Sequence, residues 1–233
     1  MTQGSSLPGT AGHDALDAIR SGGLVPLYSS PDVDDLYRVA EALAAAGIFV
    51  MEVTLRAPGA LEALGPLAHR VESEGLPLMV GAGTVLDAAA AEAAIRSGAR
   101  FIFSPVVDPE VAARCCANEV AWIPGCATPT EVHAAMTLGC TAVKLFPADA
   151  IGGPGFLRSI RSVFPDVRAI PSGGIGPDPD VIEAWFRAGA IAVAMGSQLF
   201  PGRTATGDDP TELQRRLASA VSAVAAARER LTT

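Results

Sequence analysis

Aromatic residues and long apolar runs are both scarce in this sequence. Aromatic residues make up 5% of its 233 positions, which disfavours recognition of single-stranded nucleic acid by stacked rings. No apolar run approaches the roughly 20 residues that a membrane-spanning helix requires. The first dozen residues are polar and rich in glycine and serine, without the basic and then apolar order of a secretion signal. We therefore expect no membrane segment, and we interpret residues 1–12 as a flexible tail.

Positive charge is also in short supply. The sequence has 17 lysines and arginines against 25 aspartates and glutamates, a formal net charge of −8. No basic patch is visible along it, so nucleic acid is not an expected partner. An anionic substrate has to be bound by a few local cations and backbone amides, against the overall field.

Histidine and cysteine occur without the spacing that metal sites or disulfides require. The three histidines are His13, His69 and His133. No two of them are four residues apart, which argues against a metal site. The four cysteines are Cys115, Cys116, Cys126 and Cys140. They form no CxxC pair, and the vicinal pair is a poor start for a structural disulfide, so we expect reduced cysteines and a cytoplasmic protein.

What the sequence does contain is enough apolar material for the core of one large domain. Apolar residues make up 49% of the chain and charged residues 18%. Short apolar segments alternate with alanine-rich stretches that have helical spacing. Strands are predicted at Leu24–Ser29, Ile48–Leu55, Pro77–Thr84, Phe101–Val107, Ala121–Ala127, Ala142–Pro147, Val167–Gly173 and Ile191–Gly196. Helices are predicted at Val33–Ala46, Ala88–Ser97, Pro129–Leu138, Asp180–Ala188 and Thr211–Arg230.

Capping residues mark the ends of the helical stretches. Residues typical of N-caps precede them at Asp32, Asp87, Asp108 and Thr128. Glycines typical of helix C-termini follow them at Gly47, Gly98, Gly139 and Gly189. The repeated order of strand, cap, helix and glycine predicts one architecture along the whole chain.

Eight strands with intervening helices predict a single (β/α)8 barrel, a TIM barrel of the α/β class, over residues 13–233. An open doubly wound sheet is the alternative, but it requires a GxGxxG motif after the first strand, and the sequence has none there. A short helix at His13–Gly22 is expected to lie across the bottom of the barrel.

Lys144 lies in the predicted strand Ala142–Pro147, which is otherwise apolar. Burial disfavours the charged ammonium and lowers its pKa. A neutral buried amine is a nucleophile toward carbonyls and forms Schiff bases. The alternative is a lysine whose ammonium group reaches water or pairs with a carboxylate.

Glu52, Thr54 and Arg56 alternate along the second predicted strand and should share one face. In a barrel that face is the interior, where unpaired polar groups are costly. If these residues have only a structural role, we expect a buried ion pair between Glu52 and Arg56. Buried charge of this kind also indicates a functional site.

Glycine groups end the last two predicted strands. Ser172, Gly173 and Gly174 follow the seventh strand, and Gly196 and Ser197 follow the eighth. Loops at these two positions form the recurrent phosphate site of barrels, because glycine exposes the backbone amides. We therefore predict phosphate binding there. Each group alone is compatible with an ordinary turn.

Six motifs occur in order at successive predicted strand ends: Glu52–Arg56, Val80–Val85, Ser104-Pro105, Ile123–Gly125, Lys144–Ala148 and Ser172–Ile175. In this ordered set the chain resembles the 2-keto-3-deoxy-6-phosphogluconate (KDPG) aldolase family, which includes 4-hydroxy-2-oxoglutarate (KHG) aldolases. The resemblance covers roughly residues 14–230. It implies a class I aldolase that uses no metal and no cofactor and releases pyruvate.

The resemblance also implies a role for each site residue. Lys144 would form the Schiff base, and Glu52 would act as general acid and base. Arg56 and Thr84 would hold the pyruvate carboxylate. The remaining substrate contacts would come from Pro105, Phe146, Ser172, Gly173, Gly174, Gly196 and Ser197. Members of this family are commonly homotrimers.

Three alternatives remain open on the sequence. Ser172 replaces the threonine usual in gluconate-type enzymes, while the Pro124–Thr128 segment looks closer to the 2-keto-3-deoxy-6-phosphogalactonate type. A phosphate-binding barrel isomerase or epimerase would share the glycine loops without needing Lys144. A non-catalytic sugar-acid binder is disfavoured, because Lys144, Glu52 and Arg56 are costly to bury without use.

Overall fold

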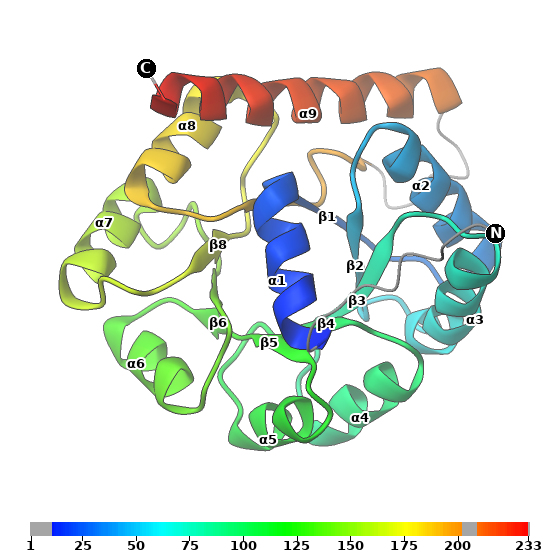
Figure 1. The fold of residues 1–233 in the computed structure, drawn as a ribbon, viewed down its shortest axis with the longest axis horizontal. Helices are drawn as coiled ribbons and strands as arrows, with labels where there is room; N and C mark the ends of the chain where they lie inside the picture. Colours follow the sequence, from blue (N-terminus) through cyan, green and yellow to red (C-terminus); the bar gives the residue numbers. More distant parts are fainter. Residues whose placement is uncertain (1–10, 202–208, 233) are drawn as a thin grey trace, which may run out of the picture.

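The computed structural model describes residues 11–201 and 209–232, and these form a (β/α)8 barrel (Figure 1). Its parallel strands are β1 (Leu24–Tyr28), β2 (Val50–Thr54), β3 (Met79–Gly83), β4 (Phe101–Phe103), β5 (Ala121–Ile123), β6 (Gly125–Cys126), β7 (Val143–Leu145), β8 (Ala169–Pro171) and β9 (Val193–Met195). Its helices are α1 (Ala11–Gly22), α2 (Val33–Ala45), α3 (Ala60–Ser73), α4 (Ala88–Arg96), α5 (Pro109–Ala117), α6 (Pro129–Thr137), α7 (Gly153–Val163), α8 (Pro179–Ala188) and α9 (Pro210–Thr232).

The fifth barrel strand is broken into two pieces at Pro124. Proline has no amide hydrogen and interrupts the ladder there, so β5 pairs with β4 and β6 pairs with β7. The Lys144 amide still donates to the Pro124 carbonyl at 2.8 Å. Parallel bridges from Ala169 to Ala190 and from Ser172 to Ala194 connect β8 to the β9 side. With β9 paired to β1, the ring of eight predicted strands is closed.

The predicted helix caps are confirmed. The side chains of Asp32, Asp87, Asp108 and Thr128 accept hydrogen bonds from backbone amides in the first turns of α2, α4, α5 and α6. The glycines that follow α2, α4, α6 and α8 all adopt positive φ, at 78°, 91°, 80° and 101°. Asp178 caps α8 in the same way, a cap that the sequence analysis did not identify.

Helix α1 closes the amino-terminal end of the barrel, as predicted. Figure 1 shows it at the centre of the ring, in front of the strands. Its buried Ala15, Leu16 and Ile19 belong to one cluster with inward-facing strand residues such as Val25 and Phe101. The helix begins at Ala11 rather than His13. Most of the predicted tail, residues 1–10, lies outside the described residues.

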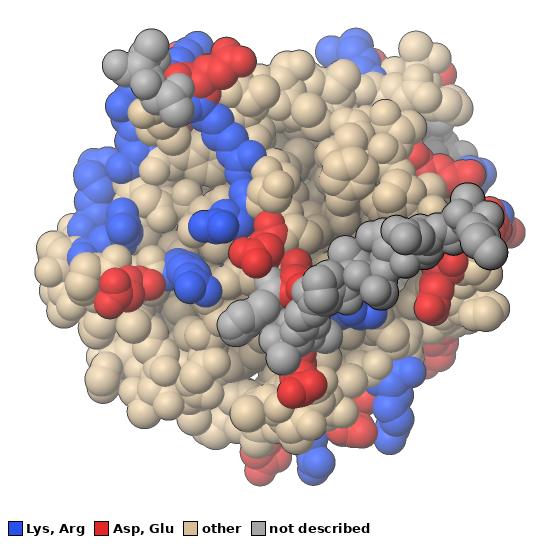
Figure 2. Space-filling view, in the orientation of Figure 1, with Lys and Arg blue, Asp and Glu red and all other residues tan. Residues whose placement is uncertain are grey.

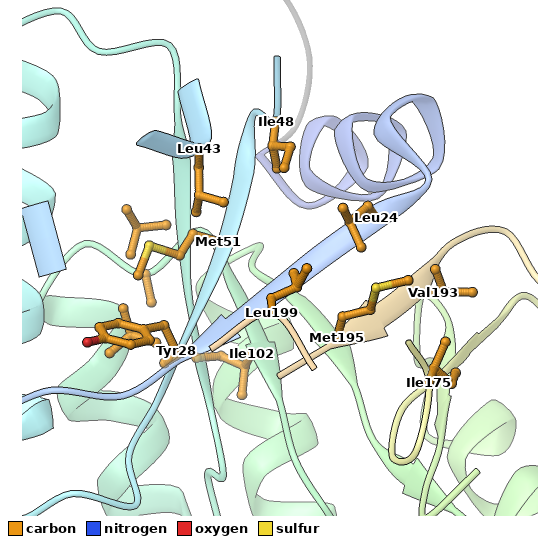
Figure 3. Packing of buried hydrophobic residues seen from close by; sticks show 14 of the residues in the cluster. Leu24, Tyr28, Leu43, Ile48, Met51, Ile102, Ile175, Val193, Met195 and Leu199 are labelled. Atoms are coloured by element: carbon orange, nitrogen blue, oxygen red, sulfur yellow. The ribbon is translucent and has the colours of Figure 1, made fainter. Parts of the chain in front are cut away.

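A second and larger cluster fills the space between the strands and the outer helices. Figure 3 shows part of it, with Leu24 of β1, Met51 of β2 and Met195 of β9. Met51 and Val53 lie in this outer cluster, so their neighbours Glu52 and Thr54 face the barrel interior. The alternation expected for β2 is therefore present over the length of the strand.

Charged side chains of both signs lie in scattered groups on the α1 face of the molecule, most of which is uncharged (Figure 2). Basic side chains gather there over α7 and α8. The last turns of these helices carry Arg161 and Arg187, where a cation complements the negative end of the helix dipole. Arg187 also pairs with Glu183 at 2.6 Å. None of the helices in the described part of the chain is long and apolar enough to cross a membrane.

Candidate active site

A buried ion pair between Lys144 of β7 and Glu52 of β2 lies inside the barrel. The Lys144 Nζ is 3.4 Å from Glu52 Oε2 and 3.5 Å from Oε1. The side chains of Lys144 and Glu52 are 8% and 0% exposed. The partner of Glu52 is thus Lys144 and not Arg56, which contradicts the ion pair considered from sequence. A carboxylate does partner the lysine, as one interpretation held, but it comes from across the barrel.

Burial decides the protonation behaviour of Glu52. Desolvation raises the pKa of its carboxyl above the ordinary value, and the nearby Lys144 and Arg56 charges only partly oppose this. The Lys144 Nζ also lies 4.9 Å from the ring centre of Phe103 and 5.8 Å from that of Phe146. A carboxyl with a raised pKa that lies beside an amine is suited to general acid–base catalysis.

The glycines of β3 make room for the interior side chains. A Cβ on Gly83 would lie 1.7 Å from Glu52 Oε1, and a Cβ on Gly81 would lie 2.3 Å from the Phe101 ring. In the structure, Glu52 and Phe101 occupy the space that side chains at these positions would need.

Arg56 lies outside the barrel interior. Strand β2 ends at Thr54, so Arg56 falls in the turn that follows and is exposed. Its Nε donates to Thr54 Oγ1 at 3.5 Å. The prediction that Arg56 continues the strand alternation is therefore wrong, because the strand is two residues shorter than the pattern. The guanidinium is still close enough to lower the pKa of Glu52.

Three further predicted residues lie at the carboxyl ends of strands, where barrel chemistry takes place. Thr84 follows β3 with φ of 61°, a conformation that is unusual for a β-branched residue and frequent at functional sites. Pro105 follows β4 and is half-buried, and a Cβ on Gly125 would lie 2.3 Å from its carbonyl oxygen. Phe146, beyond β7, is 40% exposed.

The predicted phosphate loops lie side by side, since the bridge between Ser172 and Ala194 brings the end of β8 next to β9. Ser172 is buried, and its amide donates to the Leu145 carbonyl at 2.9 Å. Gly173 and Gly174 have φ of 104° and 73°. On the neighbouring strand end, Gly196 is half-buried and Ser197 is exposed.

Asp149 is a residue at this rim that the sequence analysis missed. A Cβ on Gly174 would lie 2.4 Å from Asp149 Oδ2, so an acidic side chain borders the glycine loop. Its Oδ1 accepts from the Ala150 amide at 2.8 Å. The aspartate follows the Lys144-Leu145-Phe146-Pro147-Ala148 motif directly, but nothing in the sequence indicates that this segment folds against Gly174.

The described residues hold no group of three His, Cys, Asp or Glu side chains arranged to bind a metal ion. The site contains the Lys144 amine, the Glu52 carboxyl, the Arg56 guanidinium and the glycine loops, with the Asp149 carboxyl at their rim. This set can form an imine, move a proton and bind anions.

Comparison with known proteins places these features in a family. Residues 16–215 match the family of KDPG and KHG aldolases. A 2-dehydro-3-deoxy-phosphogluconate aldolase from Zymomonas mobilis is 38% identical over 164 residues, which cover 70% of this chain and 76% of that protein. The structure of the KDPG aldolase of Zymomonas mobilis ZM4 with 3-phosphoglycerate has a TM-score of 0.77, with 33% identity over 89% of this chain and 95% of the other.

A second solved structure, KDPG aldolase from Legionella pneumophila, contains pyruvate captured at low pH as a covalent carbinolamine intermediate. It is 29% identical with a TM-score of 0.75, covering 91% of this chain and 97% of the other. The family match spans most of the barrel, including the strand ends that carry Lys144, Glu52 and the glycine loops. The chain belongs to the family of KDPG and KHG aldolases.

Proposed function

We propose that this protein is a class I aldolase that cleaves 2-keto-3-deoxy-6-phosphogluconate to pyruvate and glyceraldehyde 3-phosphate. The observation that carries the proposal is the buried contact between Lys144 and Glu52. Because burial raises the pKa of Glu52, its carboxyl is suited to take up and return protons beside the Lys144 amine during the reaction.

The reaction follows from these two groups. Glu52 takes a proton from the Lys144 ammonium, and the amine attacks the C2 carbonyl to give a carbinolamine. Glu52 then returns this proton to the carbinolamine hydroxyl, which leaves as water, so that an iminium forms and Glu52 is a carboxylate again. Glu52 takes the proton of the C4 hydroxyl, the C3–C4 bond breaks, and its electrons pass into the iminium to form an enamine while the aldehyde leaves. Glu52 then returns a proton to C3, and hydrolysis of the imine releases pyruvate and the free amine.

The other predicted residues bind the substrate in this proposal. Arg56 and Thr84 hold the carboxylate of the pyruvyl part, and Pro105 and Phe146 line its pocket. The phosphate group lies against Ser172, Gly173, Gly174, Gly196 and Ser197. Pyruvate and 3-phosphoglycerate in the two related structures support both halves of the site.

Two other aldol substrates fit the same catalytic pair. The phosphogalactonate analogue differs only in its configuration at C4. The other substrate, 4-hydroxy-2-oxoglutarate, lacks the phosphate and would be cleaved to pyruvate and glyoxylate. A barrel isomerase or epimerase would share the phosphate loops but has no use for a buried Lys144–Glu52 pair. Of these activities, the cleavage of a phosphorylated keto acid uses both the catalytic pair and the phosphate loops.

We expect phosphorylated substrate to be cleaved far more efficiently than its dephosphorylated form. Charge-assisted hydrogen bonds to the phosphate are worth roughly 1.5–3 kcal/mol each, and such remote binding energy raises kcat/KM. The measurement is a lyase assay, after exhaustive chelation, on phosphorylated and unphosphorylated 2-keto-3-deoxy acids of both C4 configurations and on 4-hydroxy-2-oxoglutarate. Full activity is expected without metal.

The phosphate contact is tested further by Ser197→Asp, which brings like charge to an exposed position of the loop. This change is expected to remove the preference for phosphorylated substrate. Ser219→Asp, at an exposed position on α9, is the matched control and should keep it. Equal efficiency of the wild type on both forms would instead identify the glycines as turns only and favour an unphosphorylated acid.

We further propose that the protein is a homotrimer in the cytoplasm, as the family resemblance implies. The cysteines, which lie unpaired at Cys115, Cys116, Cys126 and Cys140, are consistent with a reducing compartment. A solution mass three times that of the chain is expected in light scattering, and a monomer mass would refute the trimer.

A further inference from the structure

Ser29 makes two hydrogen bonds that bracket the turn carrying Arg56. Its hydroxyl donates to the Thr54 carbonyl at 2.5 Å and accepts from the Ala57 amide at 3.3 Å. Ser29 lies directly after β1 and is half-buried. One side chain of the first strand end thus holds the backbone on both sides of Arg56.

The turn depends on few other contacts. The Leu55 amide donates to the Gly83 carbonyl at 2.8 Å, the Ala60 amide donates to the Ala57 carbonyl at 3.1 Å, and helix α3 begins only at Ala60. The Arg56 side chain is exposed, and its Nε reaches the Thr54 hydroxyl at 3.5 Å, near the limit for a hydrogen bond. The direction of the guanidinium is therefore set mainly by the backbone that Ser29 holds.

We infer that Ser29 is a positioning residue for Arg56, and through it for the carboxylate of the bound keto acid. The inference rests on the proposed function, in which Arg56 binds that carboxylate. A guanidinium binds a carboxylate through two parallel hydrogen bonds of defined geometry. A shift of about 1 Å in such a group is enough to lower activity strongly.

A hydroxyl is suited to this role because it donates and accepts at once. Ser29→Ala leaves the Thr54 carbonyl and the Ala57 amide without this partner, whereas Ser29→Thr keeps the hydroxyl. Ser30 provides a matched control at the next position. Its hydroxyl accepts from the Asp32 amide at 3.1 Å, just before α2.

The test measures the pyruvate concentration at which borohydride trapping at Lys144 reaches half of its maximum. For Ser29→Ala we expect that concentration to rise roughly tenfold, the effect of about one lost hydrogen bond, with the maximal labelling unchanged. Ser29→Thr should restore it, and Ser30→Ala should leave it at the wild-type value. Thermal unfolding of Ser29→Ala and Ser30→Ala shows whether the two variants are folded alike.

A double-mutant cycle separates positioning from a general loss of structure. Arg56→Ala should itself weaken pyruvate binding, and adding Ser29→Ala to it should have no further effect, because residues that act through one group are not additive. Additive effects would overturn the role of Ser29. An unchanged half-saturating pyruvate concentration in Ser29→Ala, or a failure of Ser29→Thr to restore it, would do the same. These outcomes would leave the proposed function standing. No trapping in the wild type would overturn the proposed function itself, and this inference with it.

Discussion

Incubation with pyruvate and borohydride is expected to add one reduced pyruvate to Lys144, and Lys144→Met is expected to abolish both this labelling and aldol cleavage. Lys144 is buried in β7 beside Glu52 and the Phe103 ring, so its amine lies next to the carboxyl that can exchange protons with the reacting atoms. Without the amine there is no iminium to accept the electrons of the broken C3–C4 bond. Methionine keeps much of the side-chain volume without the nucleophile.

The sequence makes this experiment unusually clear. Lys144 is the only lysine in the sequence, and the other 16 of its 17 lysines and arginines are arginines. The amino terminus is therefore the one other primary amine that pyruvate can modify. Peptide mapping by mass spectrometry distinguishes the two sites. Label at the amino terminus alone, or none, would refute a class I mechanism at Lys144.

The second large effect is expected for Glu52→Gln, which should slow turnover by about 10²–10⁴-fold, the usual size of a general acid–base contribution. The amide keeps the shape of the side chain, whose oxygen lies within 1.7 Å of the Cβ position of Gly83, but it cannot exchange protons. Single-turnover cleavage and pyruvate trapping separate the rate of chemistry from binding. Glu72→Gln, an exposed change on α3, is the matched control.

The pH dependence gives Glu52 a second signature. Burial raises the pKa of its carboxyl, so the limb of the rate profile due to Glu52 should lie above the ordinary glutamate range and disappear in Glu52→Gln. A raised folded-state pKa also means that this group stabilises the fold at low pH and that its contribution is lost as pH rises through that pKa. Near-normal turnover with only a raised KM would make Glu52 a binding residue.

The architecture and the catalytic candidates could both be predicted from local features of the sequence. Alternating apolar and helical segments, with caps at Asp32 and Thr128, predicted the barrel that the structure has. These signals are local, because a cap or a strand period depends on residues a few positions apart. Lys144 was identified in the same way, from a single cation in an apolar strand.

Which side chains come into contact could not be predicted in this way, because it depends on how distant strands pack together. Glu52 and Lys144 are 92 positions apart in the chain and come into contact because β2 and β7 face each other across a closed barrel. Arg56, the nearer candidate partner in sequence, is exposed because β2 ends before it. Asp149 lies against Gly174, and Ser29 makes hydrogen bonds on both sides of Arg56. Each of these contacts connects residues at the ends of two different strands. Such contacts depend on strand length and ring closure, which arise from packing of the whole domain and leave no local pattern.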